Sequence, residues 1–196
     1  MIGLILETST EKGAIVLSRE DRPIAFTPLL GGAFLSKNLA LEVDQILKNH
    51  SLKPDYLAVG TGPGSYTGIR VGAALARALS FGWKIPLFGF CGLSSFAPLD
   101  APPHAVVVDA KMGGVYVLQQ APPQILSLAV AEVELRDIPL LFSPHPEMVK
   151  KRLSLSGEWF ETAPDPKTLA SIGYSLFLEG KLETLSLVYP PTQTIS

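Results

Sequence analysis

The chain has 196 residues, of which 47% are hydrophobic and 17% are charged, a composition typical of a folded globular protein that excludes a disordered one. Sixteen basic against 18 acidic residues give a net charge of -2, which disfavours a protein that binds nucleic acid alone. The single cysteine, Cys91, excludes an intramolecular disulfide. Because neither a leader peptide nor a membrane-length apolar stretch is visible, we expect a soluble, cytoplasmic protein.

The start of the chain predicts a strand meander followed by a helix. Short apolar runs at residues 2–6, 14–17 and 24–27 are separated by polar, turn-forming residues, so we expect them to pair as three antiparallel strands. Ser36 is typical of a helix N-cap, and Pro54 forbids continuation of that helix. Between them, apolar residues recur at helical spacing, namely Leu39, Val43, Ile46 and Leu47.

A glycine-rich turn joins the next expected strand to the next helix. Residues 56–59 predict a buried strand, residues 69–81 an alanine-rich helix, and residues 87–90 a further strand. The turn itself reads Gly60-Thr61-Gly62-Pro63-Gly64-Ser65-Tyr66-Thr67-Gly68. This order of elements, with the meander before it, favours a mixed α/β sheet over a purely parallel one.

A proline-rich segment at residues 98–103 is the best candidate for a linker. We therefore expect an N-terminal lobe at residues 1–99 and a smaller C-terminal lobe at residues 104–196. In the C-terminal lobe, the pattern predicts a second hairpin at residues 105–109 and 115–118 and a third apolar run at residues 125–133. It also predicts two helices, at residues 147–153 and 166–178. For the last helix, Asp165 is the expected N-cap and Gly180 the expected stop.

The two lobes begin with similar hairpins. In the first, an apolar strand ends in Glu7, and the second strand starts at Gly13. In the other, the strand ends in Asp109 and its partner starts at Gly114, with one residue fewer in the turn. Chance is an alternative, because hairpins of this type are common, but the match favours an internal duplication and two ribonuclease-H-like lobes side by side.

Two interpretations compete for the glycine-rich turn. Exposed N–H groups at the start of a helix can bind a phosphate, and Arg70 could assist. However, the spacing is neither that of a Walker loop nor that of a dinucleotide-binding loop. Because Gly68 and Gly72 lie one helical turn apart, close packing of another helix or docking of a partner is the favoured interpretation.

The acids Glu7 and Asp109 also have two interpretations. If both point into one cleft between the lobes, they could hold a metal ion and position water. Alternatively, each accepts hydrogen bonds from its own hairpin turn. The second interpretation is favoured, because the C-terminal lobe has no glycine-rich segment that would bind a nucleoside.

The other reactive side chains do not predict catalysis. The three histidines stand alone, so we expect no metal site. Cys91 is expected to be a buried structural thiol, Ser65 does not sit in a nucleophile elbow, and the basic residues 150–152 are expected on a solvated helix face. The apolar faces of the first two helices are expected either to cover their own sheet or, where exposed, to dock a second protein.

Three segments of the chain resemble a known family. They are residues 6–10 (Leu-Glu-Thr-Ser-Thr), residues 60–72 (from Gly-Thr-Gly-Pro-Gly-Ser to Val-Gly) and residues 108–116 (from Val-Asp-Ala-Lys to Val-Tyr). These look like the signature segments of the bacterial TsaB (YeaZ) proteins, and the middle segment is highly specific. The likeness runs to about Tyr116 and resumes weakly at residues 179–180 and 188–190.

The resemblance implies a fold of the actin, sugar-kinase and Hsp70 superfamily, with a reduced second lobe, and a role in forming threonylcarbamoyladenosine next to the anticodon of tRNAs that read codons beginning with A. The family implies a non-catalytic subunit that forms a heterodimer with the transferase TsaD, on which the ATPase TsaE docks. It implies contact with tRNA only through that complex, no membrane association, no metal and no tightly bound cofactor, with room for ATP or ADP at the partner interface.

The same resemblance implies two sets of site residues and no catalytic ones. The helices at residues 36–49 and 67–81 would carry the TsaD interface, with the candidates Leu39, Val43, Ile46, Leu47, Gly68, Arg70, Gly72 and Ala76. A vestigial phosphate loop would include Glu7, Thr8, Gly62, Gly64, Ser65 and Asp109.

The chain also departs from the family pattern. The first acid is usually Asp and is Glu7 here, the histidine pair of TsaD is absent, and residues 190–193 replace an ending that usually carries an arginine. Two rival functions remain: a small-molecule kinase or ATPase that uses Glu7, Asp109 and the loop at residues 62–68, and a homodimeric binding module with no tRNA role.

Overall fold

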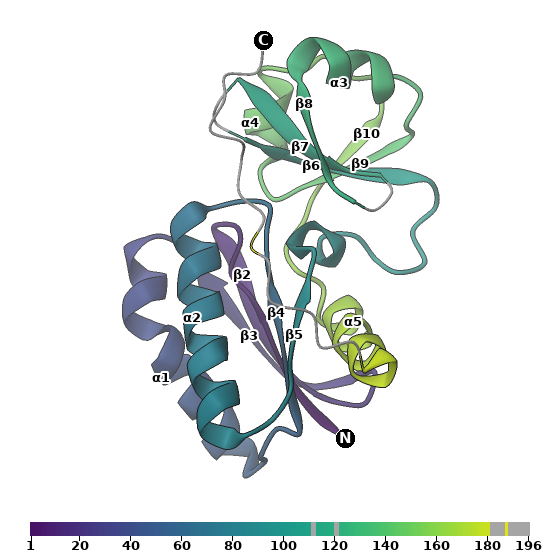
Figure 1. Cartoon of the computed structure of the whole chain (residues 1–196). Helices are drawn as coiled ribbons and strands as arrows, with labels where there is room; N and C mark the ends of the chain where they lie inside the picture. Colours follow the sequence, from purple (N-terminus) through teal and green to yellow (C-terminus); the bar gives the residue numbers. More distant parts are fainter. Residues whose placement is uncertain (111–112, 120–121, 181–186, 188–196) are drawn as a thin grey trace.

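The chain forms two lobes, each built on a five-stranded mixed sheet (Figure 1). The computed structural model describes residues 1–110, 113–119, 122–180 and Leu187. The first sheet has the order β3-β2-β1-β4-β5, with β1 (Ile2–Glu7), β2 (Lys12–Arg19), β3 (Arg22–Leu30), β4 (Tyr56–Gly60) and β5 (Leu87–Phe90). The second has the order β10-β9-β6-β7-β8, with β6 (His104–Asp109), β7 (Gly114–Leu118), β8 (Gln124–Ser127), β9 (Leu140–Ser143) and β10 (Glu158–Glu161).

The two sheets repeat one topology. In each, an antiparallel meander of three strands is followed by two strands that continue the sheet in parallel from the first strand of the meander. Glu7 pairs with Ala14 in the first sheet, and Asp109 pairs with Val115 in the second. The duplication predicted from the two hairpins is therefore confirmed as a repeat of strand order, and the two acids hold equivalent positions.

Helices cover both faces of the first sheet (Figure 1). On one face lie α1 (Ala33–His50) and α2 (Tyr66–Trp83), whose buried residues pack on Leu4 and Leu6 of the central strand β1. On the other face lies α5 (Pro166–Glu179), where Leu169 and Ala170 pack on Ile5. Alternate residues of β1 thus face opposite helical layers, as the pleat of a strand requires.

The position of α5 corrects the expected division into lobes. The sequence assigned this helix to the C-terminal lobe, but it packs against strands β1 to β5 of the first sheet. Phe177 stacks on Tyr56 with 4.9 Å between ring centroids, and a Cβ atom at Gly173 would lie 2.8 Å from Ile5 Cγ1, so the contact is close. The helix therefore belongs to the N-terminal lobe, because its apolar face is buried against the first sheet.

The second sheet has helices on one face, α3 (Leu128–Glu134) and α4 (Pro146–Lys150), which pack on Val107 and Val117. Its other face contacts the 3₁₀ helix Gly92–Ser95 and the residues after it. There, Leu93 and Phe96 pack against Tyr116 and Phe142. This apolar contact holds the second lobe against the carboxyl ends of β4 and β5, where the candidate site lies.

Several expected boundaries are confirmed and others move. The Asp165 carboxylate caps α5 by accepting the Thr168 N–H at 2.7 Å, and Gly180 ends the helix with φ +63°, as predicted. Ser36 lies inside α1, because the backbone turn at Gly32, with φ +72°, lets the helix start earlier.

The run at residues 125–133 divides into β8 and α3 at Ser127, whose hydroxyl accepts the Val130 N–H at 3.4 Å and so caps α3. The sequence did not clearly predict β9 and β10, which are only four residues long. In the part of the chain that the structure describes, no helix has both the length and the apolar character needed to cross a membrane.

Candidate functional site

The turn between β1 and β2 packs directly on the start of α2. The Thr8 hydroxyl donates to the Gly68 carbonyl at 2.9 Å, and the Ser65 N–H donates to the Ser9 carbonyl at 2.6 Å. A Cβ atom at Gly68 would lie 2.1 Å from the Thr8 carbonyl oxygen, and one at Gly72 would lie 2.2 Å from Thr8 Oγ1. These two glycines thus permit a close approach, but to the chain's own turn rather than to another helix or a partner.

The same turn after β1 also occupies hydrogen-bonding groups of the glycine-rich loop between β4 and α2. The Ser65 N–H, one of the groups that the phosphate interpretation would use, is already bonded to the Ser9 carbonyl. Gly64 has φ +153°, and a Cβ atom there would lie 2.1 Å from the Ser9 carbonyl oxygen. On the opposite side, the Gly62 carbonyl accepts the Gly92 N–H at 2.8 Å. The loop geometry therefore favours close packing over phosphate binding, but the packing is against the chain's own turn and not against another helix or a partner.

Glu7 is completely buried at the end of β1. Its Oε1 atom accepts the Ser9 N–H at 2.6 Å and also the Ser9 hydroxyl, whereas Oε2 has no hydrogen-bond partner among the described residues. Cβ atoms at Gly60 and Gly92 would lie 1.9 Å and 2.7 Å from Oε2, so the carboxyl group occupies space that two glycines leave. Burial raises the pKa of Glu7 above its usual value, and the Ser9 hydrogen bonds offset part of that effect.

Asp109, at the equivalent position in the second lobe, has a different environment. Its carboxylate forms an ion pair with Arg152, which follows α4, and it lines the cavity between the lobes. The interpretation in which Glu7 and Asp109 both face one cleft is therefore wrong for Glu7. The favoured interpretation, in which the carboxyl group bonds to its own turn, is confirmed for Glu7. The expected solvated basic face is wrong for Arg152, although Lys150 is exposed and pairs with Glu147 at 2.8 Å.

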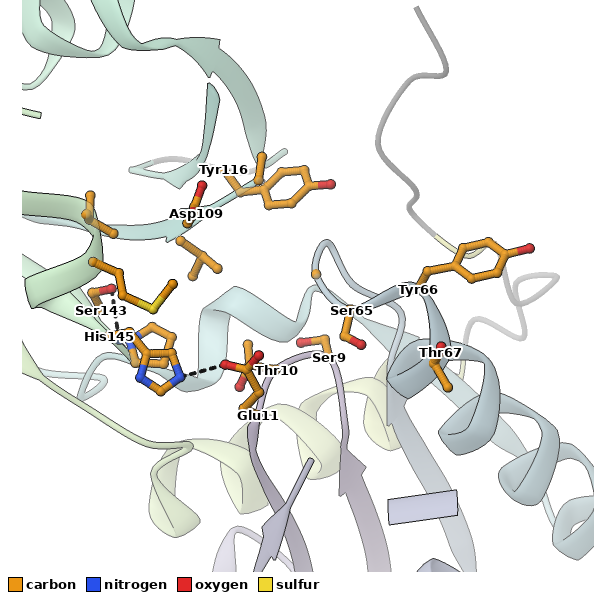
Figure 2. Close-up of a pocket in the computed structure, with 16 residues that line it drawn as sticks. Ser9, Thr10, Glu11, Ser65, Tyr66, Thr67, Asp109, Tyr116, Ser143 and His145 are labelled. Atoms are coloured by element: carbon orange, nitrogen blue, oxygen red, sulfur yellow. Dashed lines mark hydrogen bonds and ion pairs between the residues drawn. The ribbon is translucent and has the colours of Figure 1, made fainter. Parts of the chain in front are cut away.

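A cavity of about 310 Å³ lies between the two lobes (Figure 2). Its walls include Ser9, Thr10, Glu11, Asp109, Tyr116 and His145. At one side, His145 Nε2 lies 2.8 Å from Glu11 Oε2, an ion-pair distance without hydrogen-bond geometry. The adjacent Lys12 forms a second ion pair between the lobes, with Glu161 at 2.5 Å.

Sequence reasoning missed His145 as a residue of this cavity. No neighbouring histidine, cysteine or repeated spacing marks it. The internal duplication contains the signal, because β9 corresponds to β4, and the loop after β9 therefore corresponds to the glycine-rich loop. That correspondence required β9 to be recognised as a strand.

The interface candidates on the first two helices belong mostly to the inner face of the lobe. Leu39, Val43, Ile46 and Ala76 are between 0% and 5% exposed and form part of the core, and Leu47 packs against it. Gly68 and Gly72 are also buried. The expectation that the buried residues of this group contact a partner is thus wrong, because their own sheet and the turn after β1 already cover them. For Leu47, which is half-buried, it stays a prediction.

Arg70 is the exposed member of that group. Its guanidinium carbon lies 5.0 Å from the centre of the Tyr66 ring, and its Nη1 atom donates to the Tyr66 hydroxyl. Arg70 therefore contacts Tyr66, at the end of the glycine-rich turn, on the exposed side of α2.

The remaining candidates agree with a structural role. Cys91 is half-buried, rather than buried as expected, and packs against the apolar cluster around Leu93 and Phe96. Burial raises the pKa of its thiol, which fits a structural rather than a nucleophilic role. Among the residues that the structure describes, no group of three or more His, Cys, Asp or Glu side chains could hold a metal ion. The third signature segment includes residues 111–112, and the C-terminal likeness includes residues 188–190; both ranges lie outside the described residues.

Known proteins resemble the chain over most of its length. The Bacillus subtilis protein named "tRNA threonylcarbamoyladenosine biosynthesis protein TsaB" is 31% identical over 205 residues, covering 87% of this chain and 86% of that protein. The Haemophilus influenzae protein of the same name is 34% identical over 124 residues, which cover 59% of this chain and 52% of that protein. The alignment with the second protein thus spans about half of its length.

A solved structure, YeaZ from Pseudomonas aeruginosa, has the same fold. Its TM-score is 0.77, at 20% identity, over 96% of this chain and 99% of that chain. A family model described as "TsaD: tRNA N6-adenosine threonylcarbamoyltransferase" matches residues 26–161. The expected two-lobed fold of the actin, sugar-kinase and Hsp70 type is therefore confirmed, and with the match to the B. subtilis protein these similarities place the chain in the TsaB (YeaZ) family.

Proposed function

We propose that this chain acts in tRNA threonylcarbamoyladenosine biosynthesis as the non-catalytic subunit that docks a TsaD-like transferase. The names of its relatives support the pathway. The observation that carries the non-catalytic role is the burial of Glu7, whose carboxyl group bonds to Ser9 and is enclosed by Gly60 and Gly92. In that position Glu7 cannot act together with Asp109 on a substrate in the cavity.

The outer face of α2 is the proposed docking surface. Ala74, Ala78 and Phe81 are exposed there, and Phe81 is 89% exposed, which is unusual for a phenylalanine. Small and aromatic residues allow close packing of a second helix. The TsaD family model matches a range that includes α1 and α2, so a TsaD-like partner would present similar helices and could pack about a pseudo-twofold axis.

Replacing Ala78 by glutamate should weaken binding to the TsaD of the same organism by at least about tenfold, because an unpaired charge would be buried at the centre of the interface. Size-exclusion chromatography with light scattering, followed by a titration, measures this loss. Ala129→Glu is the matched control, since Ala129 is also an exposed helical alanine but lies on α3 in the second lobe. Equal effects of both substitutions would contradict the proposed surface.

A cellular experiment tests the pathway. Deleting the gene should lower tRNA threonylcarbamoyladenosine, measured by mass spectrometry of digested tRNA, and the wild-type chain should restore it while Ala78→Glu should not. A deletion that left the modified nucleoside unchanged would sink the proposed role. The same proposal includes the other partners. The tRNA contacts the complex rather than the isolated chain, and a TsaE-like ATPase docks on the pair. ATP or ADP occupies the partner interface, and without TsaD the exposed helices pair with a second copy of the chain.

The cavity between the lobes supports a second candidate, a small-molecule kinase or ATPase. Asp109 lines that cavity, where it could position a magnesium-bound nucleotide. Magnesium-dependent ATP turnover by the isolated chain, abolished by Asp109→Ala, would favour this candidate over the docking role.

A further inference from the structure

Glu7 is a completely buried acid that the proposed docking function leaves without a role. Burying a carboxyl group costs free energy unless its hydrogen bonds offset the loss of water, and here one oxygen has no partner among the described residues. Gly60 and Gly92 leave the room that this carboxyl group fills. An aliphatic side chain would fill the same space at a lower desolvation cost, so the hydrogen bonds that Glu7 accepts indicate its purpose.

Those hydrogen bonds lead directly to α2. Glu7 accepts both the backbone N–H and the hydroxyl of Ser9, and the Ser9 carbonyl in turn accepts the Ser65 N–H at 2.6 Å. The hydroxyl of Thr8, which lies between Glu7 and Ser9 in the chain, donates to the Gly68 carbonyl at 2.9 Å. Ser65 is the N-cap of α2, and Gly68 lies in its first turn. The start of the helix is therefore held at two points by three consecutive residues.

The first turns of α2 also present part of the proposed docking surface. Tyr66 and Arg70 are exposed and interact with each other, and at intervals of four residues they continue into Ala74 and Ala78 on one helical face. Any shift of the helix start would move Tyr66 and Arg70 relative to the rest of that face.

Building on the proposed docking function, we propose that Glu7 is a positioning residue for α2: by holding Ser9, its carboxyl group sets the place where α2 begins and so aligns Tyr66 and Arg70 for the partner. It touches neither the partner nor tRNA.

Three variants of the full chain test this proposal. Glu7→Ala removes the acceptor and should weaken TsaD binding and speed hydrogen exchange of the Ser65 amide, each by at least about tenfold. Glu7→Gln keeps an acceptor oxygen for Ser9 and should change both by less than about threefold. The matched control is Val16→Ala, which truncates a completely buried side chain on the face covered by α5 and should leave both values within about threefold. Calorimetric titration and mass-spectrometric exchange are measured at a temperature where circular dichroism shows each variant folded.

The outcomes separate the positioning role from the docking role. Unchanged exchange of the Ser65 amide in Glu7→Ala, or equal effects of Val16→Ala, would overturn the proposal. If the wild-type chain does not bind TsaD but Glu7→Ala alone speeds this exchange, the docking role fails and the positioning role stands. If Glu7→Ala does not fold, Ser9→Ala decides, because it removes only the hydroxyl donor: exchange at Ser65 should rise at least about threefold, and no change would overturn the proposal.

Discussion

Replacing Gly68 by alanine is expected to destabilise the protein by about 3 kcal/mol or more. The added Cβ atom would lie 2.1 Å from the carbonyl oxygen of Thr8 and 3.3 Å from its carbonyl carbon. Both are backbone atoms, so no rotation of a side chain can relieve the clash. The helix α2 must move away from the turn after β1, and the hydrogen bond from the Thr8 hydroxyl to the Gly68 carbonyl is then lost.

The same helix offers a control of opposite sign. Gly82 lies near the exposed end of α2, and a Cβ atom there would have nothing within 4 Å. Gly82→Ala should therefore stabilise the protein by about 0.4 to 1 kcal/mol, because alanine restricts the unfolded chain and favours the helix. Urea unfolding of both variants measures the difference. A destabilisation of similar size at both positions would contradict the close contact at Gly68.

Replacing Glu7 by glutamine is expected to stabilise the protein increasingly as the pH rises. Burial raises the pKa of Glu7 in the folded state above its value in the unfolded chain. Between those two pKa values the folded state holds a proton that the unfolded state has released, so the contribution of Glu7 to stability is lost with increasing pH. Glutamine is neutral at every pH and does not carry this loss.

Urea unfolding of the wild type and of Glu7→Gln between about pH 4 and pH 8 measures this effect. Below the unfolded pKa of glutamate the difference should be constant, and above it the advantage of Glu7→Gln should grow at up to about 1.4 kcal/mol per pH unit. Glu158→Gln, which changes an exposed carboxylate on β10, should stay within about 0.5 kcal/mol of the wild type. An advantage that shrinks with pH would mean that the folded state favours the ionised carboxylate.

Local signals in the sequence account for much of the fold. The last helix shows this, because Asp165, Pro166 and Gly180 each act within a few residues of the chain and mark its ends as predicted. The two hairpins whose first strands end in Glu7 and Asp109 indicated the duplication for the same reason, since strand, turn and glycine follow one another directly in the chain. The signature segment at residues 60–72 indicated the TsaB (YeaZ) family.

Where each of these elements packs depends on contacts between residues far apart in the chain. Helical periodicity marked Leu39, Val43 and Ile46 as an apolar face but could not say whether the first sheet or a partner covers it. It also could not show that α5 returns to the first sheet, or that His145 meets Glu11 across the cavity.

Glu7 gives the clearest case of this division. The residue type and its place at the end of a strand are visible in the sequence, but the direction of its side chain is decided by the space that Gly60 and Gly92 leave and by the hydrogen bonds from Ser9. Gly60 and Gly92 are more than 50 residues away along the chain and meet Glu7 only when the strands assemble. Periodicity and capping are local properties of a chain, whereas the enclosure of a side chain requires the whole sheet.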